Sequence, residues 1–162
     1  MSDIIKEEEL KKELENRFAG SIYDANITRK NRLWLGVSPE RALELMSFLK
    51  EKGYSHLSTI TGFDEGEKLG AIYHITDWHT VVNVKVRTPK SAPSLKTVRE
   101  IYPVCESFER ELEDLFGIKV EGLPEGRNYP LPEGFPKGVH PLRKEVKLDE
   151  LVKQLDGIKE EK

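Results

Sequence analysis

The sequence predicts an α+β fold: a mainly antiparallel sheet with helices packed on one face, followed by a long C-terminal arm rich in proline and glycine. Two stretches in the first third place apolar residues at helical spacing. In residues 56–88, apolar residues instead occur at every second position, as in a strand. After residue 117, prolines and glycines are too dense for a helix or a central strand. We therefore expect an α+β domain over residues 1–116, an extended arm over 117–147, and a C-terminal helix and tail over 148–162.

The first third predicts two helices separated by a hairpin. Residues 3–19 place leucines and a phenylalanine on one helical face. Residues 22–28 and 33–37 alternate apolar and polar side chains around a polar turn, which indicates a hairpin. Ser38 is a suitable N-cap for a second helix, which has proline at its first position and Gly53 after its end.

Residues 56–88 predict three antiparallel strands, because apolar side chains alternate over residues 57–63, 69–75 and 82–86. The prolines that follow indicate a loop, with one turn of helix over residues 95–101. The end of the chain repeats apolar residues at helical spacing from Leu148 onward, and we expect this last helix to end at Gly157.

Residues 107–116 predict a short amphipathic helix that ends at Gly117 in a left-handed C-cap. Its apolar face is expected to consist of Phe108, Leu112, Leu115 and Phe116. Its opposite face is expected to carry charges from Glu106, Glu109, Arg110, Glu113 and Asp114. The helix therefore has one side to bury and one side for ion pairs.

The predicted arm contains large apolar residues, which a solvated linker would lack. These residues are Leu123, Tyr129, Leu131, Phe135, Val139 and Leu142. Segments longer than about 12–15 residues without regular structure are uncommon and tend to be functional or disordered. We interpret the segment as an arm laid over the surface of another protein.

Composition excludes several classes of function. The chain has 26 Lys and Arg against 29 Asp and Glu, a formal charge of −3, with the signs interleaved; nucleic acid is therefore not an expected partner. Cys105 is the single cysteine, so it forms no intramolecular disulfide and cannot hold an iron–sulfur cluster alone. No stretch reaches about 18 consecutive apolar residues, so we expect contact with a membrane only through other proteins.

The candidate chemical groups are better explained by structure than by catalysis. Glu109, Glu111, Glu113 and Asp114 are numerous enough for acid–base chemistry. Nothing in the sequence forces one of them into an apolar site, so we expect solvated or partner-facing carboxylates.

The histidines and the cysteine give a similar result. His56, His74 and His79 could supply three nitrogens to a metal, but their spacing guarantees no common face. His140 precedes a proline in the arm, which favours an interface role, and Cys105 is expected to be a buried thiol. Motifs for phosphate loops, dinucleotide binding and nucleophile elbows are absent from the sequence.

Residues 109–118, Glu-Arg-Glu-Leu-Glu-Asp-Leu-Phe-Gly-Ile, resemble the signature of the C-subunit family of respiratory complex I, the NADH:quinone oxidoreductase. This family also has members in energy-converting membrane-bound nickel–iron hydrogenases. Residues 73–75, 82–86 and 138–144 match the family in the same order. Residues 123–128 depart from the family's His-Pro-Asp-Leu-Arg-Arg type of segment: the histidine is absent, and Arg127 corresponds to an arginine.

The resemblance implies a non-catalytic accessory subunit that binds no cofactor, with the iron–sulfur clusters and the nickel–iron or quinone sites in partner subunits. It implies that the chain holds the large catalytic subunit beside the iron–sulfur small subunit, as a peripheral protein on the cytoplasmic side of the membrane. The residues expected to bind partners are Glu109, Arg110, Glu111, Glu113, Asp114, Phe116, Arg127, Tyr129, Leu131, Phe135, His140 and Arg143.

Among the complexes that this family serves, we favour a ferredoxin-linked, ion-translocating hydrogenase. Charged residues make up 34% of the chain, against about 25% in typical proteins, and such enrichment is known in hyperthermophile proteins. A subunit of a NADH:quinone oxidoreductase and a subunit of a membrane-bound sulfur reductase are the alternatives. A hypothesis of another class is a small stand-alone hydrolase that uses His140 or the acidic helix.

Overall fold

The computed structural model describes residues 2–127 and 129–160, with the side chains of residues 6–127 and 129–157, so the last residues of the predicted tail, 161–162, lie outside it. The first seven elements are α1 (Ser2–Arg17), β1 (Ile22–Arg29), β2 (Arg32–Val37), α2 (Pro39–Glu51), β3 (His56–Asp64), β4 (Lys68–Thr76) and β5 (Val81–Pro89). They are followed by β6 (Ser94–Lys96), a 3-10 turn η1 (Pro103–Cys105), α3 (Glu106–Glu111), a π-helical turn η2 (Leu112–Phe116), β7 (Lys119–Glu121) and α4 (Leu148–Glu160).

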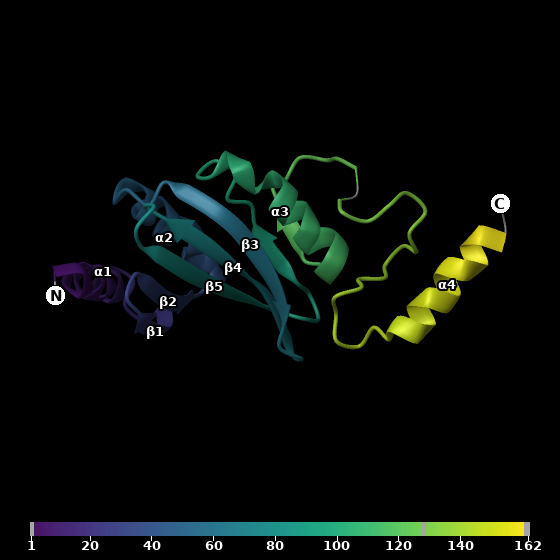
Figure 1. Cartoon of the computed structure of the whole chain (residues 1–162), viewed down its shortest axis with the longest axis horizontal. Helices are drawn as coiled ribbons and strands as arrows, with labels where there is room; N and C mark the ends of the chain where they lie inside the picture. Colours follow the sequence, from purple (N-terminus) through teal and green to yellow (C-terminus); the bar gives the residue numbers. More distant parts are fainter. Residues whose placement is uncertain (1, 128, 161–162) are drawn as a thin grey trace.

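The main sheet has five strands in the order β1-β2-β5-β4-β3 (Figure 1). Three of its pairings are antiparallel, as expected, and they include the three-stranded unit β3-β4-β5. The sheet is nevertheless mixed, because β2 pairs with β5 in parallel. The chain between them, α2 and the β3-β4 hairpin, carries it back to the starting end of the sheet, as a parallel pairing requires.

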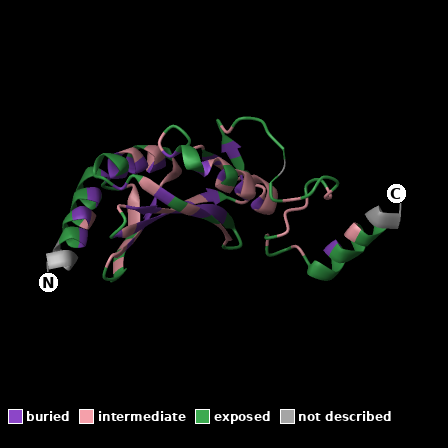
Figure 2. Ribbon diagram, turned by 45° about the horizontal axis from the view of Figure 1, so that its top comes forward, coloured by how far each residue is buried: buried purple, intermediate pink, exposed green. Residues whose placement is uncertain are grey.

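The core lies between the sheet and the helices α2 and α3, which cover the same face (Figure 2). Alternate residues of the central strands are buried on this side, including Leu35, Tyr73 and Val84. Their neighbours on the opposite face form a polar network. There His74 is hydrogen-bonded to Thr61 (2.9 Å) and Asn83 (2.7 Å). The histidine is thus a structural residue of the sheet.

A second, two-stranded sheet replaces the helical turn expected over residues 95–101. Strand β6 pairs in parallel with β7, and Leu95 and Val120 are both buried. Regular structure therefore continues beyond residue 117, where the arm was predicted to start. Three-residue strands are too short for alternation to reveal, and their pairing depends on a partner distant in the sequence.

The helix predicted over residues 107–116 is confirmed, and Gly117 has the expected left-handed conformation (φ 65°). Between Gly122 and Lys147, the described residues contain no helix or strand. The last helix, α4, continues through Gly157, where it was expected to end.

Strand β3 packs so closely on η2 that one position has no room for a side chain. A Cβ atom on Gly62 would lie 2.4 Å from Cε2 of Phe116 and 3.0 Å from Leu112. We expect Gly62→Ala to lower the free energy of unfolding by about 1–3 kcal/mol through overpacking. Urea denaturation measures this, with the exposed Ser58→Ala on the same strand as control. Equal stabilities of the two variants would show that the contact adapts freely.

Candidate partner-binding site

The site is built on the end of a helix that changes its hydrogen-bond pattern. Helix α3 continues into the π-helical turn η2, where the N–H of Gly117 donates to the carbonyl of Leu112, five residues earlier, and also to that of Glu113 (3.0 Å). Such π-turns are rare in proteins, and those that occur are often found at functional sites. The reversal at Gly117 leaves the last carbonyls of the turn open to donors from elsewhere in the chain.

Glu109 is fully buried, and its prediction as a solvated or partner-facing residue is wrong. Its carboxylate accepts hydrogen bonds from the hydroxyl of Thr97 (2.6 Å) and the N–H of Val98 (2.8 Å). Burial raises the pKa of Glu109, and burial together with the charge of Glu109 raises the pKa of the Cys105 thiol to about 12. Cys105 is buried, as expected.

The sequence did contain a signal for this burial. Glu109 lies three residues before Leu112 and seven before Phe116, so it belongs to the apolar stripe of the helix. The segment that follows β6 covers this stripe and supplies the hydrogen-bond donors. Thr97 was not predicted as a site residue, because nothing in its spacing connects it to the helix.

The other acidic residues of the signature bind the backbone of their own chain. Glu113 accepts from the N–H of Val120 (3.1 Å), and Asp114 accepts from the N–H of Leu131 (3.4 Å). Glu111 is half-buried. The carboxylates of Glu113 and Asp114 fix the strand β7 and the middle of the arm beside the helix.

Arg110 clamps the beginning of the arm. Its guanidinium donates to the carbonyl of Pro124 (2.8 Å) and to Glu106 on the preceding helical turn (3.1 Å). A Cβ atom on Gly126 would lie 2.4 Å from the guanidinium, so a glycine there lets the arm pass directly over Arg110. Arg110 therefore contacts its own chain first, and its expected role toward a partner stays a prediction.

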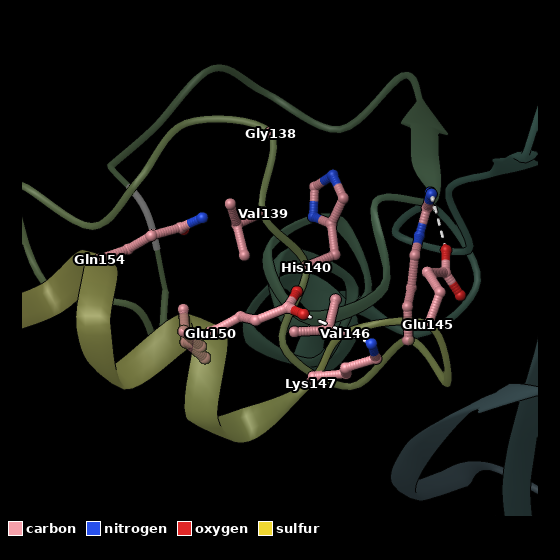
Figure 3. Close-up of a pocket in the computed structure, with 10 residues that line it drawn as sticks. Gly138, Val139, His140, Glu145, Val146, Lys147, Glu150 and Gln154 are labelled. Carbon is pink, nitrogen blue, oxygen red and sulfur yellow. Dashed lines mark ion pairs between the residues drawn. The ribbon is translucent and has the colours of Figure 1, made fainter.

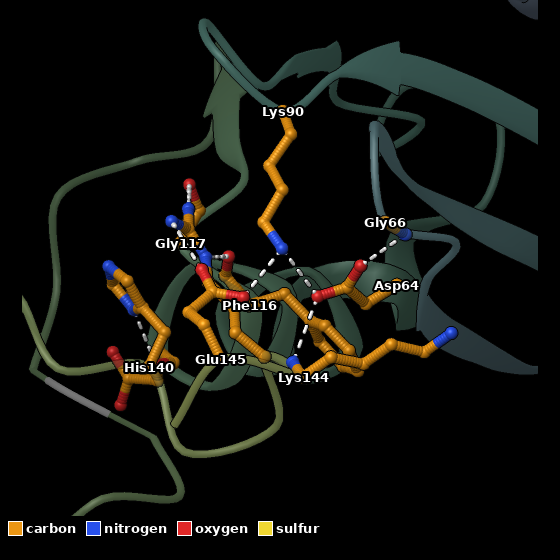
Figure 4. A network of polar contacts seen from close by, with 10 residues as sticks. Asp64, Gly66, Lys90, Phe116, Gly117, His140, Lys144 and Glu145 are labelled. Atoms are coloured by element: carbon orange, nitrogen blue, oxygen red, sulfur yellow. Dashed lines mark hydrogen bonds and ion pairs between the residues drawn. The ribbon is translucent and has the colours of Figure 1, made fainter. Parts of the chain in front are cut away.

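The end of the arm returns to the helix end and occupies its open carbonyls (Figure 4). His140 donates from Nδ1 to the carbonyl of Asp114 (2.9 Å), and Arg143 donates from Nε to that of Phe116 (2.6 Å). The N–H of Leu142 donates to the carbonyl of Leu115 (3.1 Å). We call this set of contacts, from residues 140–143 to residues 114–117, the helix-end clasp.

A charged latch holds the arm on the main sheet next to the clasp (Figure 4). The carboxylate of Asp64, with 2% of its side chain exposed, accepts from Lys90 Nζ (2.8 Å), the N–H of Lys144 (2.9 Å) and the N–H of Gly66 (2.8 Å). Lys90 also pairs with Glu145 (2.5 Å). Burial opposes ionisation of Asp64, but these donors outweigh it and lower its pKa to about 2.

Two shallow hollows adjoin the clasp. One, of about 300 Å³, is lined by Asp114, Leu131, Phe135 and His140. Another, of about 250 Å³, lies between the arm at Gly138–His140 and the residues Glu150 and Gln154 of α4 (Figure 3). The structure thus brings Leu131, Phe135, His140 and Arg143 together with the acidic helix, while their expected role toward a partner stays a prediction.

The exposed rim of the site is a groove of about 580 Å³ between the start of α3 and the arm. Val104 and Tyr129 line it with 54% and 41% of their surface exposed, and Arg127 beside them is exposed. Val104 was not predicted, because one exposed valine in a sequence carries no signal. We call Val104, Arg127 and Tyr129 the rim.

The described residues contain no group of three or more His, Cys, Asp or Glu that could hold a metal ion. No helix among them is long and apolar enough to cross a membrane. His140 meets the backbone of Asp114, not a carboxylate, so no specific contact favours the stand-alone hydrolase.

Comparison with known proteins gives relatives over nearly the whole chain. The membrane-bound hydrogenase subunit beta of Pyrococcus furiosus is 32% identical over 150 residues, covering 88% of this chain and 87% of that one. The C subunit of the F(420)H(2) dehydrogenase of Methanosarcina mazei is 31% identical over 137 residues, covering 82% and 86%. Among solved structures, a chain from the membrane-bound sulfane sulfur reductase, an archaeal respiratory membrane complex, has a TM-score of 0.81 at 26% identity and covers 93% of this chain and 91% of that one.

This α+β fold is therefore shared with named subunits of membrane-bound redox complexes. The model of the family described as the respiratory-chain NADH dehydrogenase 30 Kd subunit matches residues 35–152. The chain belongs to this family, and the resemblance to the C-subunit family of complex I is confirmed.

Glu109 makes the stability depend on pH. The pKa of Glu109 is raised in the folded chain. Its contribution to the free energy of unfolding is therefore full below the ordinary glutamate pKa and is lost as the pH rises through the raised value. Glu109→Gln keeps an acceptor without the charge, so the wild type should lose stability relative to this variant as the pH rises from about 4 to about 8. Urea denaturation over this range tests the difference, with Glu111→Gln as control. A difference that does not change with pH would contradict the assignment.

Loss of the latch is expected to open the arm locally. We expect Asp64→Ala to raise hydrogen exchange in residues 138–147 about tenfold or more, because hydrogen bonds to a buried carboxylate are lost. Since the pKa of Asp64 is lowered to about 2, its contribution to the stability of the folded chain is full above the ordinary aspartate pKa. This contribution is lost as the pH falls toward 2. The exposed Glu67→Ala, on the same hairpin, is the control. Unchanged exchange in Asp64→Ala would show that the clasp alone holds the arm.

Proposed function

We propose that the chain is a non-catalytic accessory subunit of a membrane-bound, complex I-related oxidoreductase, and that it holds the large catalytic subunit beside the iron–sulfur subunit. The arrangement of the arm carries this proposal. The arm is fixed to its own domain by the clasp and the latch, and its rim is left exposed. An arm without regular structure that is already held in place can bind a partner at a lower cost in entropy.

Family membership supports the coarser part of this proposal. The relatives are named as subunits of membrane-bound hydrogenase, F(420)H(2) dehydrogenase and NADH dehydrogenase complexes, so the chain is a subunit of a complex of this type. The peripheral position on the cytoplasmic side, and the placement of all metal, nickel–iron and quinone chemistry in partner subunits, belong to the proposal.

Three redox classes remain within the proposal, and the NADH:quinone oxidoreductase is supported by the family match. The match to the hydrogenase subunit of Pyrococcus furiosus over most of both chains supports a membrane-bound hydrogenase, for which we propose a ferredoxin link and ion translocation. The TM-score of 0.81 with a sulfane sulfur reductase chain supports a membrane-bound sulfur reductase as the second candidate. The cysteines of the co-purifying large subunit distinguish them, because a nickel–iron site takes four.

The expected partner-binding residues divide into two kinds of role in this proposal. Arg127 and Tyr129 would contact a partner directly, with Leu131 and Phe135 in the adjoining hollow. Glu113, Asp114, His140 and Arg143 would act by fixing the shape of the arm through contacts within the chain. Glu109, Arg110, Glu111 and Phe116 would support the helix that carries both groups.

The rim provides the test of this function. We expect the double variant Arg127→Glu with Tyr129→Ala to weaken assembly with the large subunit about thirty-fold or more, because interface Arg and Tyr residues often dominate binding. The stability of the isolated chain should change by less than about 0.5 kcal/mol, since both side chains are exposed.

Native mass spectrometry of the co-expressed complex measures the assembly, and urea denaturation measures the isolated chain. The control is Glu51→Lys, an exposed charge reversal at the end of α2. Assembly of the rim variant at the wild-type level would contradict the proposed role of the arm.

A further inference from the structure

The end of the main sheet opposite the arm carries an exposed tryptophan. Strand β3 runs from His56 at this end to Asp64 at the latch, so the two ends are separated by the length of the strand. Trp78 lies in the turn between β4 and β5, and 73% of its surface is exposed. Among the described residues it is the most exposed large hydrophobic side chain.

The turn holds Trp78 in an unusual conformation. Trp78 has φ 75°, a left-handed backbone that a bulky side chain seldom adopts. The carboxylate of Asp77 accepts from the N–H groups of His79 (3.0 Å) and Thr80 (2.7 Å), and the hydroxyl of Thr76 accepts from the N–H of Trp78 (2.9 Å).

Contacts outside the turn fix it further. Lys6 pairs with Asp77 (2.8 Å), and the indole stacks on the His56 ring at 4.3 Å between centroids. The chain thus uses residues from α1 and β3 to keep an apolar side chain in solvent. Backbone strain that is held this firmly points to function.

Cations lie at the same end of the sheet. The N–H of Val81, at the start of β5, donates to the carbonyl of Asn31 in the β1-β2 turn (3.0 Å), which joins the two turns. Arg29 and Arg32 face each other across the β1-β2 pair. No described residue forms an ion pair with either guanidinium. Like charges directly opposite in a sheet are destabilising, so the pair is better explained by an anionic partner.

We propose that Trp78, Arg29 and Arg32 form a second docking surface, which binds an acidic polypeptide segment of a partner subunit. Tryptophan and arginine are the residue types enriched at the centres of protein interfaces, and carboxylates complement the unpaired guanidinium groups. The surface lies at the other end of the sheet from the arm, so the chain would bridge two partners.

An anionic lipid surface has a related chemistry, because tryptophan and arginine also occur at membrane interfaces. The structure favours the protein partner. Interfacial anchoring takes an extended apolar face, whereas this surface has one indole on a rigid turn.

The test uses the full chain within its co-expressed complex. Hydroxyl-radical footprinting compares the oxidation of Trp78 in the isolated chain and in the complex, and Trp78 should be protected in the complex. Trp78→Ala should weaken binding of the subunit at this end about thirty-fold, and Trp78→Phe should weaken it less.

The arginines are tested by cross-linking. Arg32→Lys places an amine that a carbodiimide couples to a neighbouring carboxylate, and the cross-link should lie in an acidic segment of a partner. The double variant Arg29→Glu with Arg32→Glu should abolish binding of that acidic segment. Lys68→Glu, at the opposite end of β4, should preserve the binding.

Three results would overturn this proposal: Trp78 oxidised equally in both states, cross-links confined to this chain, or binding of phosphatidylserine vesicles that Trp78→Ala abolishes. None of them depends on the arm. Loss of assembly in the rim variant with an unprotected Trp78 would leave the proposed function standing and reject the second surface alone.

Discussion

The open carbonyls at the end of the α3–η2 helix are the constraint on which the rest of the site depends. The last carbonyl groups of a helix lack partners within it, and a buried carbonyl without a donor is costly. Here His140, Leu142 and Arg143 supply donors from more than twenty residues further along the chain. The need to satisfy a helix end therefore determines where an otherwise irregular arm lies.

This constraint changes the meaning of the charged signature. As a sequence, residues 109–118 resemble a surface that meets other proteins. In the structure Glu109, Glu113 and Asp114 accept hydrogen bonds from their own chain, and Arg110 donates to the arm. The signature thus fixes the shape of the arm, and the exposed side chains of the rim stand beside it.

The sequence predicted the elements that depend on local patterns. Alternation identified β3, β4 and β5, helical spacing identified α1, α2 and α3, and Gly117 marked the left-handed end. The parallel pairing of β2 with β5, the small sheet of β6 with β7, and the Asp64 latch were missed, because each joins residues distant in sequence. Glu109 was wrongly assigned to the charged face, although its spacing from Leu112 and Phe116 places it in the apolar stripe, and the segment that covers it, at Thr97 and Val98, was not visible from the helix pattern.

The central claim is that the chain prepares its arm before a partner binds. Hydrogen exchange of the isolated chain and of the assembled complex tests it most directly. The account predicts that the amides of residues 142–144 are protected already in the isolated chain, and that residues around the rim, 125–129, gain protection only in the complex. An arm that exchanges freely until assembly, or a rim that stays unprotected in the complex, would contradict the account.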